Sequence, residues 1–203
     1  MSPFLKEVFK IGLFDIFKKN SLIKKGITFE NQGNYQEALK CYDKIISEVD
    51  VNYVDAWYGK GVISNNLEEY EKALNCFDKV INLDPTYVKA WYSKGFVFGK
   101  VKMYNEAIKC LDKALELDPS YIDAWDRKGR VLGSLKKHYE AIECFNKALK
   151  LDPKSVDTWY GKGLMFGAVK KYNEAIGCFN KALELDPNFE PAKEALEHEN
   201  SKI

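Results

Sequence analysis

The chain has 203 residues, of which 46% are apolar and 30% are charged, a composition typical of a folded protein rather than a disordered one. Its 31 basic and 30 acidic residues give a formal net charge of +1, so overall charge favours neither nucleic acid nor an anionic membrane as a partner. No uncharged apolar run approaches the roughly 18 residues of a transmembrane helix, and we expect a cytoplasmic protein.

Residues 1–18 predict an amphipathic helix that is unusually apolar. Charged residues interrupt its Phe, Leu and Ile positions and no small-residue cleavage site follows, which argues against a signal peptide. Three hypotheses stay open for this helix: it packs against the first repeat, it occupies the groove of its own or a second copy of the chain, or it docks on a membrane surface. The membrane hypothesis depends on Lys6, Lys10, Lys18 and Lys19.

Beginning near residue 19, the sequence repeats with a period of about 34 residues. AWYGKG at Ala56, AWYSKG at Ala90, AWDRKG at Ala124 and TWYGKG at Thr158 each begin one full period after the one before. The stretches that follow are also similar, for example NEAIKCLDKALELDP and NEAIGCFNKALELDP. An earlier copy, SLIKKG at Ser21, is one residue out of step, so five units run from about residue 19 to 189.

Within each unit, apolar and small residues lie three and four positions apart in two blocks, which predicts two helices per unit. A proline ends most of the second helices, because proline lacks an amide donor and disfavours helical geometry in the residue before it. Each first helix contains a glycine, which costs about 1 kcal/mol relative to alanine and therefore predicts a close helix contact. We expect these glycines to face small residues of the second helix: Gly26, Gly61, Gly95, Gly129 and Gly163 to face Ala38, Ala73, Ala107, Ala141 and Ala175.

The pattern W–K–G at the head of a unit, Y–x–x–A in its middle and F–x–x–A–L–x–L–D–P at its tail resembles the tetratricopeptide repeat (TPR). The resemblance implies an all-α fold, a right-handed α-solenoid of stacked antiparallel helix-turn-helix repeats, similar to archaeal and bacterial TPR proteins. We therefore expect an N-terminal amphipathic helix at 1–18, TPR 1 at 19–53, TPR 2 at 54–87, TPR 3 at 88–121, TPR 4 at 122–155, TPR 5 at 156–189 and a C-terminal capping helix at 190–203.

Cysteine and lysine each recur at one position of every unit. Equivalent atoms of stacked repeats are separated by about 10 Å, which is too far for a disulfide, so we interpret the cysteines as packing residues rather than as a metal or disulfide set. The lysines stand where TPR sequences usually have leucine, and their stems can pack while the ammonium group reaches water. The cysteines are Cys41, Cys76, Cys110, Cys144 and Cys178, and the lysines are Lys25, Lys60, Lys94, Lys128 and Lys162.

The TPR resemblance places a binding groove on the first helix of each hairpin. The aromatic residues there suit an extended peptide or an amphipathic helix. Arg127 and Arg130 would offer, with Lys100, a cationic spot for an acidic group; alternatively the two arginines pair with aspartates nearby. The expected groove residues are Tyr58, Val62, Asn65, Asn66, Tyr92, Phe96, Lys100, Arg127, Arg130, Tyr160 and Leu164.

The sequence shows no phosphate-binding loop, no nucleophile beside a base and no metal-ligand spacing, so we expect no catalytic residue, metal or cofactor. Our first hypothesis is a non-enzymatic scaffold or adaptor that binds a peptide or helix of a partner protein in its groove. The alternative is a module that assembles or regulates a complex at a membrane surface through the N-terminal helix. Self-association through that helix is a further hypothesis, and nucleic acid is not an expected partner.

Overall fold

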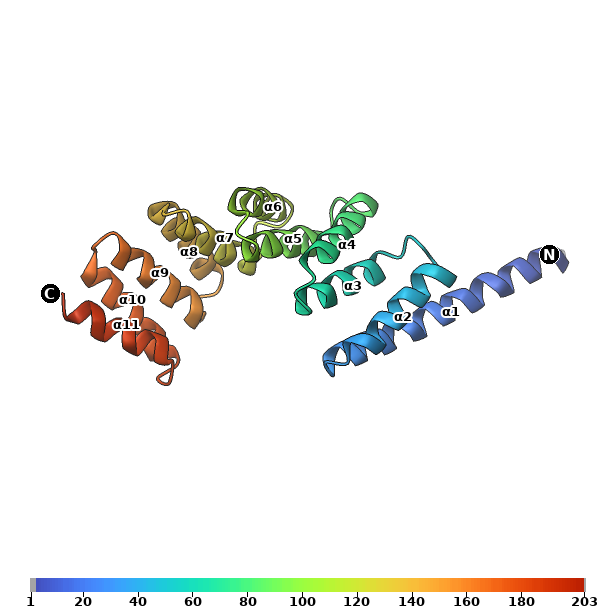
Figure 1. Cartoon of the computed structure of the whole chain (residues 1–203), viewed down its shortest axis with the longest axis horizontal. Helices are drawn as coiled ribbons and strands as arrows, with labels where there is room; N and C mark the ends of the chain where they lie inside the picture. The colour runs from blue at the N-terminus through green and yellow to red at the C-terminus, as the bar shows by residue number, and fades with distance from the viewer. Residues whose placement is uncertain (1–2, 203) are drawn as a thin grey trace. The chain divides into compact units, whose positions relative to one another are not determined.

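The computed structural model describes the backbone of residues 3–202 and the side chains of residues 16–202. All regular secondary structure in this part of the chain is α-helical, as predicted, and short turns join successive helices (Figure 1). In chain order the helices are α1 (Pro3–Asn31), α2 (Tyr35–Glu48), α3 (Val54–Asn66), α4 (Tyr70–Leu83), α5 (Val88–Lys100), α6 (Tyr104–Leu117), α7 (Ile122–Ser134), α8 (His138–Leu151), α9 (Val156–Ala168), α10 (Tyr172–Leu185) and α11 (Glu190–Asn200).

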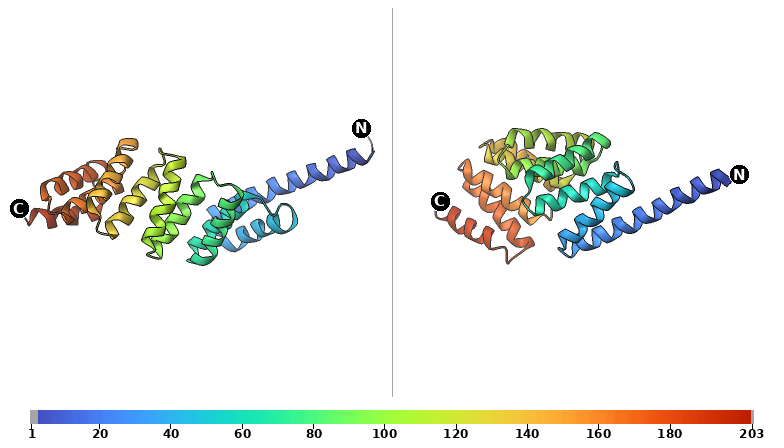
Figure 2. Two further views of the ribbon diagram at one scale, coloured as in Figure 1. Left: turned by 90° about the horizontal axis from the view of Figure 1, so that it is seen from above. Right: turned by 45° about the vertical axis from the view of Figure 1, so that its right-hand side comes forward.

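The helices form two compact units, one ending at Val97 and the other beginning at Phe98, so the boundary lies inside α5. In the first unit, α1 packs against α2, α2 against α3, and α3 against α4. In the second unit, each helix from α6 to α11 packs against the next. Contacts also join α1 to α3 in the first unit and α7 to α9 and α9 to α11 in the second, so the first helices of these hairpins lie side by side. Each unit is therefore a stack of antiparallel helical hairpins (Figure 2).

A glycine and an aromatic ring make the close contact inside the hairpins. A Cβ atom added to Gly61 would lie 2.6 Å from Cε1 of Phe77, and one added to Gly163 would lie 2.5 Å from Cε1 of Phe179. Both phenylalanines are 1% exposed, so each ring fills space that only a glycine leaves open. The predicted close contact is present, but the predicted partner was wrong. The atoms nearest to these glycines belong mainly to the aromatic ring of the second helix and not to its alanine.

Tryptophan side chains form hydrogen bonds to the turns that connect the hairpins. Each indole Nε1 donates a hydrogen bond to a main-chain carbonyl six residues earlier, which belongs to the Asp-Pro turn in three of the four cases. Asp84 Oδ1 accepts the main-chain N–H of Thr86 at 2.9 Å and so shapes the same turn. The indole bonds are Trp57 to Val51 (2.7 Å), Trp91 to Pro85 (2.9 Å), Trp125 to Pro119 (2.9 Å) and Trp159 to Pro153 (3.0 Å).

Three of the five recurring lysines form ion pairs between adjacent hairpins. Each joins the first helix of one hairpin to an aspartate on the second helix of the hairpin before it: Lys60 with Asp43 (2.6 Å), Lys94 with Asp78, and Lys128 with Asp112 (2.6 Å). The equivalent residue in the next unit is Asn146. Lys162 makes no ion pair within the described residues, and its Nζ lies 4.9 Å from the ring centroid of Trp159. The row of ion pairs therefore ends before the last hairpin boundary.

The turn inside each hairpin contains one residue with left-handed backbone geometry. An L-residue in this conformation is disfavoured by about 1–2 kcal/mol, which glycine avoids. The first hairpin uses glycine, whereas the other four use charged residues: Gly33 (φ 72°), Glu68 (60°), Lys102 (62°), Lys136 (61°) and Lys170 (61°).

The first helix is longer than its hairpin requires. The helix α1 has 29 residues against 14 in α2, and its N-terminal half continues past the end of α2 (Figures 1 and 2). It runs unbroken across residues 18 and 19, where we expected one segment to end and the first repeat to begin. Lys18 Nζ lies 3.0 Å from Glu48 Oε2, and Lys19 Nζ lies 3.3 Å from Asp50 Oδ2. Two of the four lysines on which the membrane hypothesis depends are thus paired with the first hairpin.

The side chains of residues 1–15 lie outside the described part of the protein, and with them most of the apolar residues on which the three hypotheses for the N-terminal segment rest. Beyond these, Ile16 is 50% exposed and Phe17 is 66% exposed. Among the residues that the structure describes, no helix is both long enough and apolar enough to cross a membrane.

The helix α11 continues the register of the repeat. Ala192 lies one repeat period after Thr158, and both are buried. Glu199 stands where earlier units have the buried apolar residues Ile63 and Val131, and it is itself only 7% exposed. Its Oε1 accepts a hydrogen bond from Lys202 at 2.9 Å, whereas Oε2 is buried with no partner among the described residues. A carboxylate thus occupies the end of the core.

Candidate partner-binding groove

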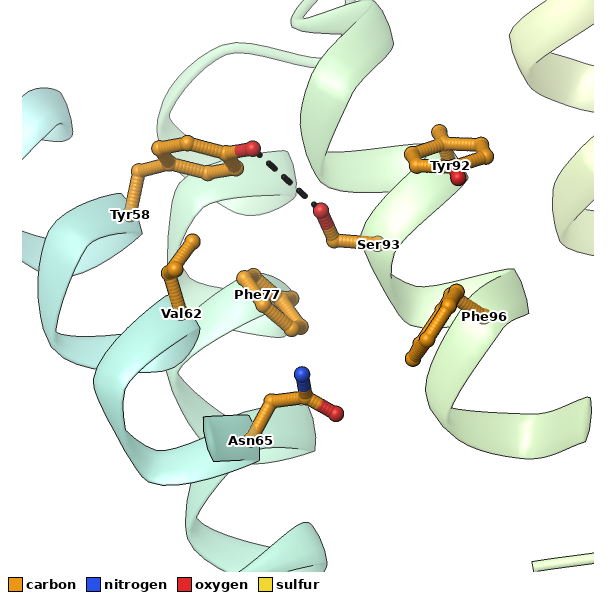
Figure 3. A pocket seen from close by; sticks show the side chains of 7 residues that line it. All are labelled: Tyr58, Val62, Asn65, Phe77, Tyr92, Ser93 and Phe96. Carbon is orange, nitrogen blue, oxygen red and sulfur yellow. Dashed lines mark hydrogen bonds between the residues drawn. The ribbon is translucent and has the colours of Figure 1, made fainter. Parts of the chain in front are cut away.

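A pocket of about 200 Å³ lies between α3 and α5 in the first unit (Figure 3). Residues of α3 line one side and residues of α5 line the other, with a ring from α4 between them. On each of α3 and α5 the lining residues are spaced so that they share one helix face. The seven lining residues are Tyr58, Val62, Asn65, Phe77, Tyr92, Ser93 and Phe96.

The walls of this pocket are mainly aromatic. The ring centroids of Tyr58 and Phe77 are 5.9 Å apart, and those of Tyr92 and Phe96 are 6.4 Å apart. The hydroxyls of Tyr58 and Ser93 lie 3.3 Å from each other across the pocket (Figure 3). Burial raises the pKa of the Tyr58 phenol, so this hydroxyl stays protonated and able to donate at neutral pH.

Asn65 lines the same pocket with its side-chain amide. Its Oδ1 atom is buried and accepts no hydrogen bond from any residue in the described part of the chain. Its Nδ2 atom lies 3.5 Å from Oδ1 of Asn66, a long contact. Because Oδ1 has almost no accessible surface, the polar group that Asn65 offers to a ligand is Nδ2, which Figure 3 shows turned toward the pocket. The pocket therefore combines apolar walls with one side-chain amide donor.

A second pocket of about 270 Å³ shares Tyr58 with the first and lies between α1 and α3. Its lining includes Ile27, which is 47% exposed, and two carboxylates, Glu30 and Asp55. Tyrosine hydroxyls hold both carboxylates in place. The full lining is Ile23, Ile27, Glu30, Asn31, Tyr42, Asp55, Tyr58, Gly59 and Tyr87.

The structure brings five of the eleven predicted groove residues together in the first pocket: Tyr58, Val62, Asn65, Tyr92 and Phe96. Asn66 is exposed at the end of α3, outside the lining. The other five, Lys100, Arg127, Arg130, Tyr160 and Leu164, belong to the second unit.

Within the second unit, Arg130 pairs with a carboxylate of its own helix. Arg130 Nε lies 2.7 Å from Asp126 Oδ2, and the other oxygen of Asp126 accepts from Thr158 Oγ1 at 3.1 Å. The alternative reading, pairing with a nearby aspartate, is therefore what the structure shows for Arg130. Tyr160 packs its ring 5.8 Å from that of Phe179, so part of it serves the core.

The cysteines lie inside the hairpins as free thiols. Four of the five are buried, and burial raises the pKa of Cys76, Cys144 and Cys178. A raised pKa lowers the thiolate fraction that could react or bind a metal. No group of three or more His, Cys, Asp and Glu within the searched residues has the geometry of a metal site.

Two lining residues were missed by sequence reasoning. Ser93 occupies the position that is glycine in two other units, at Gly59 and Gly161. This exchange of glycine for serine was the sequence signal that could have assigned Ser93 to the groove. Phe77 lies on the second helix, and its place in the core gave no reason to assign it to the groove. Its ring fills the base of the hairpin and reaches the pocket from behind α3 and α5.

Stacked helical hairpins with an apolar pocket on their first helices define the class of repeat proteins that act as interaction scaffolds, and the solenoid fold predicted from the sequence is present. Tetratricopeptide-repeat models match residues 54–87, 88–121, 122–155 and 156–189, and a further model of this repeat matches residues 20–49. The chain therefore belongs to the tetratricopeptide-repeat family.

Solved structures of TPR proteins resemble this chain over most of its length. A structure of MamA from Desulfovibrio magneticus RS-1, from residue 41 to the end, is 26% identical with a TM-score of 0.76, and the match covers 85% of this chain and 97% of that one. Another MamA structure is 25% identical with a TM-score of 0.73, covering 84% of this chain and 92% of that one. YrrB, described as a TPR protein with an unusual peptide-binding site, is 24% identical with a TM-score of 0.72, covering 87% of this chain and 90% of YrrB. No curated protein matches.

Proposed function

We propose that this chain is a scaffold that holds a peptide or helical segment of a partner protein in the pocket between α3 and α5. The observation that carries the proposal is the pocket itself, where an aromatic wall and the side-chain amide of Asn65 lie together. An apolar side chain of the partner would enter between Val62 and Phe96. Full burial of a Leu or Phe side chain stabilises binding by about 1.5–3 kcal/mol.

Asn65 would add direction to this apolar contact. Its Nδ2 would donate to a main-chain carbonyl of the bound segment, an acceptor that every peptide carries regardless of its sequence. The hydroxyls of Tyr58 and Ser93 are close enough to share one further polar group of the ligand. An apolar anchor beside polar groups that hold the backbone is a common arrangement in peptide recognition.

The test is affinity capture of partners from native extract with the full chain and with Tyr92→Ala plus Phe96→Ala. Removing both rings should reduce captured partners at least tenfold, since aromatic anchors in buried pockets commonly contribute about 2 kcal/mol or more. Tyr139→Ala is the matched control, because this tyrosine of α8 is 60% exposed and lies in the other unit. If the double variant is folded and retains every partner, the proposal fails. The adaptor role and the cytoplasmic location stay predictions.

A further inference from the structure

We infer that the pocket between α1 and α3 is a subsite for a basic side chain, so that the segment bound by this scaffold carries a lysine or arginine close to its apolar anchor. The inference rests on the proposed function, because the two pockets share Tyr58 and would be filled by one segment. The inference specifies the charge of the bound segment, whereas the proposed function specifies only its apolar anchor.

Two carboxylates give the pocket its charge. Tyr42 donates its hydroxyl to Glu30 Oε2 at 2.8 Å, and Tyr87 donates its hydroxyl to Asp55 Oδ1 at 3.2 Å. Neither carboxylate forms an ion pair within the described residues. Neutral hydroxyls orient the carboxylates without cancelling their charge, and each carboxylate keeps lone pairs for a further donor.

The pKa values of the tyrosines around the pocket also reflect the negative charge of these carboxylates. The pKa values of Tyr42 and Tyr87 are raised first by burial and then by these carboxylates, Glu30 for Tyr42 and Asp55 for Tyr87. Glu30 also acts to raise the pKa of Tyr58. No lysine or arginine of the described residues is among the causes of these three shifts.

The shape of the pocket selects a long basic side chain rather than a small cation. Ile23 and Ile27 of α1 line the pocket beside the carboxylates, and Ile27 is 47% exposed. The methylene stem of lysine or arginine would cover these isoleucines while its charged head reaches Glu30 and Asp55. A volume of about 270 Å³ leaves room for such a side chain.

The spacing of the ligand follows from the shared tyrosine. Only the ring of Tyr58 is common to both pockets, so the basic and apolar side chains lie on either side of it. In an extended segment, side chains on one face are two residues, or about 7 Å, apart. In a helical segment they are three or four residues apart. The ligand thus carries its basic residue two to four positions from its apolar anchor.

The experiment is selection of a random peptide library displayed on phage against the purified full chain. Four proteins are compared: the wild type, Glu30→Gln plus Asp55→Asn, Tyr92→Ala plus Phe96→Ala, and Asp123→Asn. The amide variants retain acceptors for the tyrosine hydroxyls, which favours an intact fold, and circular dichroism checks it. Asp123→Asn removes an exposed carboxylate at the position equivalent to Asp55, but in the other unit.

Peptides selected by the wild type and by Asp123→Asn should be enriched in lysine and arginine two to four positions from an apolar residue. The Glu30→Gln plus Asp55→Asn variant should lose the basic preference and keep the apolar one, and a labelled wild-type peptide should bind it about tenfold more weakly. Equal basic enrichment for this variant and the wild type would overturn the inference alone. Peptides that bind the Tyr92→Ala plus Phe96→Ala variant equally well, or no selected peptides at all, would overturn the proposed function as well.

Discussion

Replacing Asn146 by aspartate should extend the row of lysine–aspartate pairs to the boundary between the last two hairpins. At the equivalent boundaries, Lys60 lies 2.6 Å from Asp43, and Lys128 lies 2.6 Å from Asp112. Lys162 occupies the same position as these lysines but has no aspartate at the equivalent site. The new carboxylate should therefore have a lysine at the position from which Lys60 and Lys128 form their ion pairs.

The exposure of the existing ion pairs indicates how much the free energy of unfolding should rise. The aspartates of the existing pairs keep 55% and 51% of their side-chain surface exposed, so water and salt screen most of the attraction. Measured exposed pairs contribute about 0.2–1 kcal/mol, and we expect about 0.5 kcal/mol here. Lys60 also lies 5.7 Å from the ring centroid of Trp57 while it pairs with Asp43, so Lys162 need not leave the ring of Trp159.

The assay is thermal unfolding followed by circular dichroism, and a gain of this size should raise the Tm by about 1–2 °C. Asn180→Asp is the matched control, because the residue equivalent to Lys162 in the next unit is Leu196. The gain should disappear in about 1 M NaCl, where the Debye length is about 3 Å, and in a Lys162→Met background. A gain equal to that of Asn180→Asp, or one unaffected by salt, would refute the reasoning.

Three further predictions concern stability. Glu199→Val should raise the free energy of unfolding by about 1 kcal/mol in urea titration, because it removes a buried unpartnered oxygen where another unit has Ile63; an unchanged or lower midpoint would contradict this. Lys136→Gly should stabilise by about 0.5–1 kcal/mol at a φ of 61°, and a loss of stability would show that the turn does not strain the lysine. The raised pKa values of Tyr42 and Tyr87 favour the protonated phenols in the folded state, so stability should be fully present below pH 10 and fall above it. Tyr42→Phe should flatten this alkaline fall, whereas an identical slope would contradict the assignment.

The repeated sequence pattern was sufficient to predict most of the fold. Because WYxKG and LDP recur at a constant interval, the number and order of hairpins followed from the sequence, and Tyr58, Val62, Tyr92 and Phe96 could be assigned to one surface. The partner of the core glycines could not be assigned in the same way. Alanine and the aromatic residue lie on the same face of the second helix, and only the backbone geometry shows which of them the glycine meets.

The polar details depended on pairs that sequence spacing does not reveal. Asp126 replaces a tyrosine, and Thr158 replaces an alanine, each as a separate departure from the repeat. The structure joins them, since Thr158 donates to Asp126 over a separation of 32 residues. The acidic pocket is similar, because Glu30 and Asp55 come from different hairpins and meet only when α1 packs against α3.

The most direct test of the groove is to map the bound peptide on the protein by NMR. Amide chemical shifts of the labelled full chain are compared before and after addition of a peptide selected by the wild type. Binding in the proposed pocket predicts that the largest changes fall on α3 and α5, near Tyr58, Asn65 and Phe96. Changes confined to the second unit would show that the partner binds elsewhere and would contradict the account.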